Sequence, residues 1–214
     1  MADLRGEPAL GLRERKKRRT RATLIDAAVG LCDRQGFDAT TVDQIAAIAE
    51  VSPRTFSRYF ATKDAIALAL IDEVVDSAAS ELMFQPRDIS NLEALRRAYI
   101  AMARNTRLAS GGALTSERML QILRIVMSSA TLRQASVEYR ASKVDVIIAE
   151  RMGTDINDRR VKLMAGVWGA VLITAMSDLA DRSVAGIDVD DVITAFEDTF
   201  AEFAGEIVGL GQPV

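Results

Sequence analysis

A cationic stretch, VSPRTFSRYFATK at residues 51–63, carries side chains that can bind a polyanion. Ser52 before Pro53 predicts a helix start, because the serine hydroxyl can accept an otherwise unpaired backbone N–H and proline has none to leave unpaired. Arg54 and Arg58 then lie four residues apart on one face of this helix. A guanidinium fork matches the O6 and N7 acceptors of guanine, or two phosphate oxygens. The stretch is therefore expected to contact nucleic acid.

Base-reading contacts are expected from one set of side chains near this helix start: Pro53, Arg54, Ser57 and Arg58. The proline and serine would add thymine-methyl and short polar contacts to those of the arginines. Most protein–DNA hydrogen bonds go to the backbone, so an alternative for either arginine is a place along the phosphates. A further alternative is pairing with Glu50 or Asp64.

Phosphate contacts are expected from hydroxyls and cations in the same region: Arg18, Arg19, Arg21, Thr41, Ser52, Thr55, Tyr59 and Lys63. The three arginines belong to RERKKRRTR at residues 13–21, where seven basic residues accompany one acidic residue. Residues 1–64 carry 12 basic and 9 acidic side chains, and residues 65–214 carry 15 and 21, so the positive charge is local in a chain of net charge −3. For Tyr59, the alternative is a ring that packs inward with its hydroxyl in water.

Short helices must hold these side chains in place. Apolar residues at helical spacing within TLIDAAVGLCDRQGF predict a first helix, and Gly36 supplies a left-handed stop. Thr41 and Gln44 form a T-x-x-Q capping box that starts a second helix of about two turns. A tight turn at Glu50 leads to the helix that starts at Ser52. Two short helices with exposed arginines on the second are the helix-turn-helix arrangement.

The remaining chain also reads as helical, with 49% hydrophobic residues, four prolines and no convincing alternating run. We expect an all-α fold of about nine helices, with a three-helix DNA-binding head followed by a larger helical body. A single cysteine, Cys32, and the absence of histidine exclude an intramolecular disulfide and the usual zinc sites. No signal peptide and no membrane-spanning run of about 18 apolar residues are expected, so the cytoplasm is the predicted location.

The residues GFDATTVDQIAAIAEVSPRTFSRYFATKDA, at 36–65, resemble the DNA-binding signature of the tetracycline-repressor (TetR) family of transcriptional regulators. The matching positions are Gly36, Phe37, Thr40, Thr41, Val42, Ile45, Ala46, Ala49, Val51, Ser52, Thr55, Tyr59, Phe60 and Lys63. The resemblance implies a homodimer that binds a pseudopalindromic double-stranded DNA operator, and a body that binds an effector and dimerises through its last two long helices. The resemblance favours a repressor over an activator.

This resemblance sets the expected domains: a disordered extension over residues 1–12, a helix-turn-helix domain over 13–62, and an effector-binding and dimerisation domain over 63–214. Three positions depart from the family pattern. Glu50 stands where glycine is common, so a positive φ there would strain the turn. Arg54 and Ser57 stand where a small residue and a tyrosine are frequent, so the base preference does not carry over from a relative.

Eight methionines suggest an apolar effector pocket, because thioethers adapt to irregular cavities, although methionine is also an ordinary core residue. The residues expected to line it are Met83, Tyr99, Met102, Met119, Met127, Met164 and Trp168. A dimer interface is expected from apolar stripes on the last two helices, and the alternative is an intramolecular core. The interface residues are expected to be Trp168, Gly169, Leu172, Met176, Val192, Phe196, Phe200 and Phe203.

Two other classes of function are alternatives. An enzyme is disfavoured because the chain has no E-x-x-H pair, no nucleophile beside a base and no glycine-rich phosphate loop. Cys32 falls on the apolar stripe of the first helix, as expected for an inert buried thiol. No catalytic residue, metal or cofactor is expected. The other alternative is a helical protein-interaction adaptor that docks through its basic arm without sequence-specific DNA binding.

Overall fold

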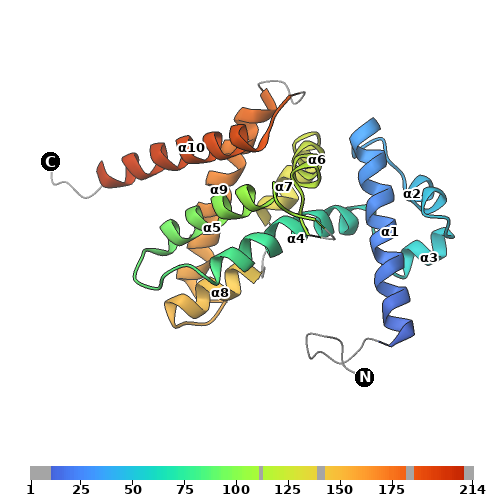
Figure 1. Ribbon diagram of the computed structural model, residues 1–214, viewed down its shortest axis with the longest axis horizontal. Coiled ribbons are helices and arrows are strands. Elements are labelled where there is room, and N and C mark those ends of the chain that lie inside the picture. The colour runs from blue at the N-terminus through green and yellow to red at the C-terminus, as the bar shows by residue number, and fades with distance from the viewer. Residues whose placement is uncertain (1–10, 111–112, 139–142, 182–185, 210–214) are drawn as a thin grey trace. The chain divides into compact units, whose positions relative to one another are not determined.

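The computed structural model describes residues 11–110, 113–138, 143–181 and 186–209. These ranges contain ten α-helices and no strand, which confirms the all-α prediction (Figure 1). The chain divides into two compact units, residues 1–66 and 67–214. The boundary lies four residues beyond the predicted end of the DNA-binding domain, inside a helix that starts at Lys63.

The first unit, called the head below, contains α1 (Leu12–Gln35), α2 (Val42–Ile48), α3 (Pro53–Ser57) and the first turn of α4 (Lys63–Leu82). The predicted disordered extension is wrong at residue 12, where α1 already begins, and residues 1–10 lie outside the described residues. The basic run at 13–21 is thus helical. Arginine, lysine and glutamate are good helix formers, so the first helix extends well before its apolar stripe.

The core of the head comes from one face of each of its helices. Its largest fully buried side chains include Leu24 of α1, Ile45 of α2 and Phe56 of α3. Phe60 packs beside Phe56 with ring centroids 5.8 Å apart. Gly36 ends α1 with φ +80°, as its predicted left-handed stop requires, and its N–H donates to Cys32 O at 2.9 Å. This packing fixes α3 by its apolar side and leaves its other side in solvent.

The second unit, called the body below, contains most of α4 and the remaining helices. These are α5 (Asn91–Asn105), α6 (Ser116–Met127), α7 (Ala130–Glu138), α8 (Lys143–Met152), α9 (Arg159–Asp181) and α10 (Val189–Gly209). α7 and α8 lie on either side of residues 139–142, which are outside the described residues. The described chain therefore has ten helices where about nine were expected.

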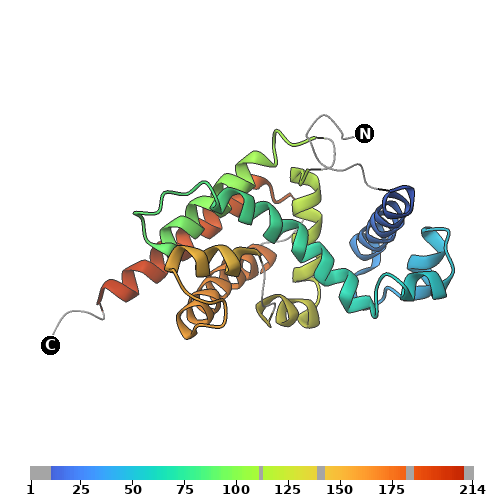
Figure 2. The ribbon, with the colours of Figure 1, turned by 90° about the horizontal axis from the view of Figure 1, so that it is seen from below.

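α9 and α10 form the most extensive helix pair of the body, and α5 packs on both of them. In two views at right angles, the C-terminal part of α10 extends past the other body helices (Figures 1 and 2). Arg118 of α6 donates two hydrogen bonds of 2.9 Å to the Glu73 carboxylate of α4. Arg151 of α8 donates to the carbonyls of Gln85 and Pro86 at 3.0 and 2.7 Å, which anchors the loop between α4 and α5.

One described helix, α9, is long and apolar enough to cross a membrane by length and composition alone. The same properties are common in core helices of soluble proteins. Val161, Trp168, Val171, Ala175 and Leu179 of α9 are all buried within the body. The apolar character of α9 is therefore explained in part by packing.

Candidate functional site

The helix start predicted at Ser52 is confirmed. Ser52 Oγ accepts the Thr55 backbone N–H at 3.1 Å and lies 3.0 Å from the Thr55 hydroxyl, and Pro53 occupies the first helical turn. Such a cap contributes about 1 kcal/mol to the stability of a helix. α3 has only five residues, so it depends on this cap and on the buried ring of Phe56 for its position.

All four predicted base-reading side chains of this segment are exposed: Pro53, Arg54, Ser57 and Arg58. Within the part of the chain that the structure describes, Arg54 and Arg58 form no ion pair, so the alternative pairing with Glu50 or Asp64 is not formed. The Ser57 hydroxyl donates to Pro53 O at 3.1 Å and can still accept a hydrogen bond. Both guanidinium groups are therefore available to an anionic or guanine-bearing partner.

Three of the hydroxyl-bearing phosphate candidates lie at the starts of α2 and α3, and Tyr59 lies just beyond the end of α3. The Thr41 capping box is confirmed: Gln44 N donates to Thr41 Oγ1 at 3.3 Å, and Thr41 N donates to Gln44 Oε1 at 3.0 Å. Thr41 and Ser52 are exposed, whereas Thr55 and Tyr59 are half-buried. Backbone N–H groups at helix starts favour anions, which suits these positions to phosphate oxygens.

The three predicted arginines of the basic run lie exposed on α1. Arg18 Nε is 4.0 Å from Glu14 Oε1, a solvent-exposed contact that contributes little stability. The Arg21 guanidinium lies 5.2 Å from the centroid of the Phe60 ring and so covers part of the apolar core of the head. Arg18 and Arg19 therefore present positive charge to solvent, while Arg21 also packs.

Lys63 has a structural role that its sequence position did not reveal. Its Nζ donates to Phe37 O at 2.9 Å and to Asp38 O at 3.4 Å, and it lies 4.3 Å from the centroid of the Phe37 ring. These contacts join the start of α4 to the turn after α1. An ammonium has three donors, so one N–H is left for a phosphate oxygen.

The turn between α2 and α3 adopts the strained geometry that its sequence suggested. Glu50 has φ +53°, and it is the one non-glycine residue with positive φ among the described residues. Its N–H donates to Ala47 O at 3.1 Å, and the next N–H, of Val51, donates to Ala46 O at 3.0 Å. These are the hydrogen bonds of an α-helix whose C-terminus ends with one residue in the left-handed conformation. Glycine is the usual residue there, whereas glutamate has a Cβ that makes this conformation unfavourable.

We expect Glu50→Gly to raise the free energy of unfolding by about 0.5–1 kcal/mol, because glycine adopts positive φ without a steric penalty. Thermal and urea unfolding of the full chain would measure the change. Glu50→Ala is the matched control, since it removes the carboxylate and keeps the Cβ. An equal gain from both variants would show that the charge, and not the backbone, causes the strain.

A second candidate site is a cavity of about 230 Å³ in the body, between α4, α5, α6, α8, α9 and α10. Six of the seven predicted pocket residues are on its wall: Tyr99, Met102, Met119, Met127, Met164 and Trp168. Met83 is not, and its inclusion was wrong. Its side chain is 70% exposed, because it follows the last residue of α4, Leu82, and points away from the core.

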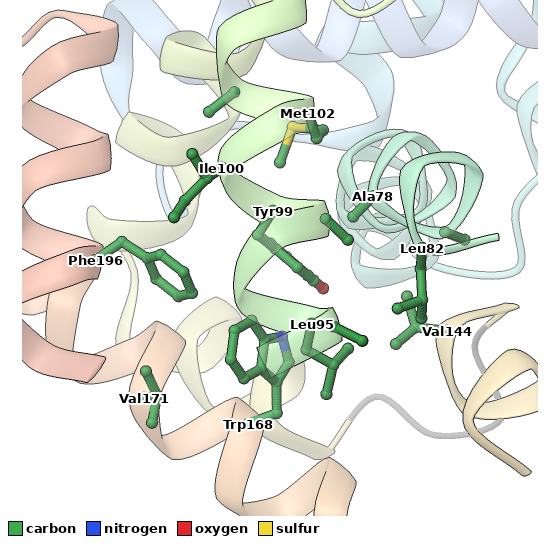
Figure 3. Close-up of a cluster of buried hydrophobic side chains, with 14 of the residues drawn as sticks. Ala78, Leu82, Leu95, Tyr99, Ile100, Met102, Val144, Trp168, Val171 and Phe196 are labelled. Carbon is green, nitrogen blue, oxygen red and sulfur yellow. The ribbon is translucent and has the colours of Figure 1, made fainter. Parts of the chain in front are cut away.

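Three aromatic rings pack together at this cavity (Figure 3). The Trp168 ring lies edge-on to Tyr99 and Phe196, with centroids 5.2 and 5.1 Å away. Trp168 is 4% exposed, and its buried Nε1 has no hydrogen-bond partner among the described residues. A buried donor without an acceptor costs about 1–3 kcal/mol. Burial raises the pKa of Tyr99 to about 12, against a smaller lowering by the nearby indole.

The predicted dimer residues point mostly inwards. Six of them line the cavity: Trp168, Gly169, Leu172, Met176, Val192 and Phe196. Phe200 and Phe203 are half-buried against the core. Trp168 and Phe196 are thus buried by their own chain, whereas Gly169, Leu172, Met176 and Val192 are half-buried, so the dimer interface stays a prediction. Spacing of three and four residues marks a buried stripe without saying which neighbour buries it.

Two features of the body carry no clear signal in the sequence. The exposed face of α9 carries Leu163, Ala170 and Thr174, and the apolar spacing of the helix does not distinguish these exposed residues from the buried ones. Asp145 of α8 is only 8% exposed and lines the cavity. A lone aspartate in a helix gives no sequence signal of burial.

Cys32 of α1 is buried as predicted, and burial raises the pKa of its thiol, which keeps it unreactive.

Known proteins match this chain both in the head and in the body. A family model described as bacterial regulatory proteins, tetR family, matches residues 24–70, which cover α2, α3 and the second half of α1. Over 204 residues the chain is 32% identical to the HTH-type transcriptional regulator TcmR of Streptomyces glaucescens. That match covers 92% of this chain and 88% of TcmR, so it extends through the body as well as the head.

Solved structures show the same fold at lower identity. SmeT, the repressor of the Stenotrophomonas maltophilia multidrug efflux pump SmeDEF, matches with a TM-score of 0.52 and 18% identity, over 85% of this chain and 89% of SmeT. Thermus thermophilus FadR, a TetR family repressor solved with lauroyl-CoA, matches with a TM-score of 0.50 and 20% identity. That match covers 85% of this chain and 91% of FadR. At these identities the likeness concerns the fold alone.

Proposed function

Because this chain belongs to the TetR family of bacterial transcriptional regulators, we propose that it is a cytoplasmic repressor that binds a pseudopalindromic operator as a homodimer. A small apolar effector in the body cavity would release it from DNA. The observation that carries the proposal is the pair of exposed arginines, Arg54 and Arg58, beside a capped and anchored α3. Rigid guanidinium groups without ion-pair partners are suited to guanine O6 and N7 in the major groove.

The proposed DNA contact divides into two parts. The exposed group around α3, which is Pro53, Arg54, Ser57 and Arg58, would read bases. Hydroxyls at the starts of α2 and α3, the Tyr59 hydroxyl after α3, Lys63 and the arginines of α1 would bind phosphates and set the position of the head. The basic run of α1 adds a sequence-independent attraction that depends on salt.

A homodimer is proposed because one short helix covers too few base pairs to select a site from a genome. Only 22% of the apolar span of α9 over 159–179 is buried within the chain. Its exposed face, called the α9 face below, carries Leu163, Ala170 and Thr174. Small and apolar residues on an exposed helix face allow close approach of a second helix. The α9 face of a second copy is the partner that twofold symmetry supplies.

Selection of bound fragments from genomic DNA by the full-length protein tests this proposal. We expect enrichment of an inverted repeat whose half-sites are about 34–36 Å apart, or somewhat more, because two symmetric α3 helices would enter successive major grooves. Arg54→Ala/Arg58→Ala in the same selection should abolish the enrichment. Fragments without a shared repeat would contradict the proposal and favour a protein-interaction adaptor.

A further inference from the structure

One buried hydrogen-bond donor of the body lacks an acceptor. Trp168 of α9 is 4% exposed, and its Nε1 has no hydrogen-bond partner among the described residues. In the described part of the chain it is the one fully buried side-chain nitrogen or oxygen for which this holds. Native proteins pair nearly all such groups, because a buried donor without an acceptor loses its hydration and gains nothing in return. An acceptor on a bound molecule would remove this penalty.

The unpaired donor belongs to the wall of the body cavity, since Trp168 is one of the lining residues. Figure 3 shows the indole nitrogen on the edge of Trp168 that faces Tyr99 and Leu95. Both of these residues also line the cavity. The nitrogen itself is fully buried, so a ligand in the cavity reaches it after a small shift of a wall side chain.

The neighbouring phenol does not supply the missing acceptor. The Tyr99 and Trp168 ring centroids are 5.2 Å apart, and the rings are inclined at 60°. Burial raises the pKa of Tyr99 to about 12 and the indole lowers it only in part, so the two groups are close neighbours, yet Nε1 forms no hydrogen bond with the phenol. The Phe196 and Phe200 rings lie 5.1 and 6.3 Å from the indole, centroid to centroid. A buried water needs several polar partners, so these rings favour a ligand acceptor over water.

The rest of the wall fits a flat, mostly apolar molecule. The rings of Tyr99, Trp168 and Phe196 lie with centroids 5.1 to 6.2 Å apart, and their edges and faces can pack on a further ring. Thioethers adapt to irregular outlines and make favourable contacts with aromatic rings. An apolar cavity of about 150 Å³ can hold one benzene ring, so a cavity of about 230 Å³ can hold two fused rings. Five methionines also line it: Met102, Met119, Met127, Met164 and Met176.

Resting on the proposed effector role of this cavity, we propose that the ligand is a neutral ring compound whose carbonyl oxygen accepts a hydrogen bond from Trp168 Nε1. A carbonyl accepts without adding a donor that the neighbouring aromatic rings would leave unpaired. A carboxylate also accepts, but the loss of its hydration beside these rings costs far more. A hydrocarbon of the same shape leaves the indole N–H unpaired. The indole therefore favours a neutral carbonyl compound by the free energy of one hydrogen bond.

Calorimetric titration of the full-length protein with 1-tetralone and tetralin tests this inference, because the two probes share one two-ring skeleton and differ only by a carbonyl in place of a methylene. We expect the ratio of the 1-tetralone affinity to the tetralin affinity to fall about 5- to 10-fold in Trp168→Phe, which removes the N–H. The ratio is the readout because the smaller ring lowers the affinity for both probes. Phe196→Leu is the matched control, since it alters the same aromatic cluster without removing an N–H and should leave the ratio unchanged.

A second measurement needs no variant. Trp168 is the single tryptophan of the chain, so isotope-labelled tryptophan gives one indole N–H signal in an NMR spectrum of the wild-type protein. We expect 1-tetralone to move the indole proton further downfield than tetralin does, because the proton enters a hydrogen bond only with the ketone. This result stands even if Trp168→Phe does not fold, which thermal unfolding of each variant would reveal.

Three results would overturn the inference: an affinity ratio that a folded Trp168→Phe variant leaves unchanged, an indole proton signal that both probes move equally, or no binding of either probe. A gel shift with the selected operator separates this inference from the proposed function. If the protein binds the operator but Trp168→Phe leaves the ratio unchanged, only the ligand class is wrong. If the ratio falls as expected but the protein binds no operator, the regulatory role is wrong and the carbonyl site stands.

Discussion

Replacing Arg54 and Arg58 together with alanine is expected to lower operator affinity about 10³-fold, to the level of unrelated DNA. Each bidentate arginine–guanine contact contributes about 1–3 kcal/mol of discrimination, and a dimer would lose the pair twice. Both side chains are exposed, so the variant should unfold at the wild-type temperature. Fluorescence anisotropy with operator and scrambled duplexes would measure the change.

A matched double variant on α1 distinguishes base recognition from sequence-independent attraction to DNA. Arg18→Ala/Arg19→Ala should weaken binding to operator and scrambled duplex by similar factors. It should also reduce the slope of log affinity against log salt by about 0.9 for each phosphate that the protein no longer neutralises. The assignment of base reading to α3 fails if the Arg54/Arg58 variant still discriminates between the two duplexes, or if the α1 pair alone removes the discrimination.

Ala170→Arg is expected to convert a homodimer to monomers and to lower operator affinity at least about 100-fold. The substitution places a guanidinium on the α9 face, where a partner helix would bury it without a counter-charge at a cost of several kcal/mol. Each monomer then reads only one half-site. Sedimentation velocity would measure the mass, and anisotropy would measure operator binding.

Ser80→Arg serves as the control for this variant, because Ser80 is exposed on α4, which is not one of the main packing neighbours of α9. It should remain dimeric and bind the operator as the wild type does. A dimer that survives Ala170→Arg would locate the interface elsewhere on the body. A wild-type protein that is monomeric at micromolar concentration would contradict the proposed dimer altogether.

The local features of the head were predictable from sequence because they depend on neighbours within four residues. The Ser52 cap and the Thr41 capping box follow from residue types at fixed short spacing, whereas the positive φ of Glu50 was expected only from the family resemblance. The extension of α1 back to Leu12 was missed because the basic run has no apolar period, although its residues are good helix formers.

The body shows where sequence reasoning stops. An apolar stripe on α9 and α10 predicts burial correctly, yet it does not show that Trp168 and Phe196 are buried at a cavity within their own chain. The identity of the covering neighbour depends on tertiary packing between helices far apart in sequence. Asp145 and Met83 illustrate the same limit in opposite directions, since the charged residue is buried and the apolar one is exposed.

Methylation interference on the selected operator tests the central claim most directly, because methylation at guanine N7 blocks the acceptor that an arginine fork uses. The account predicts strong interference at guanines in two symmetric half-sites, about one helical turn apart or slightly more, and its loss in the Arg54→Ala/Arg58→Ala variant. Operator binding that is indifferent to N7 methylation, or interference confined to a single half-site, would contradict it.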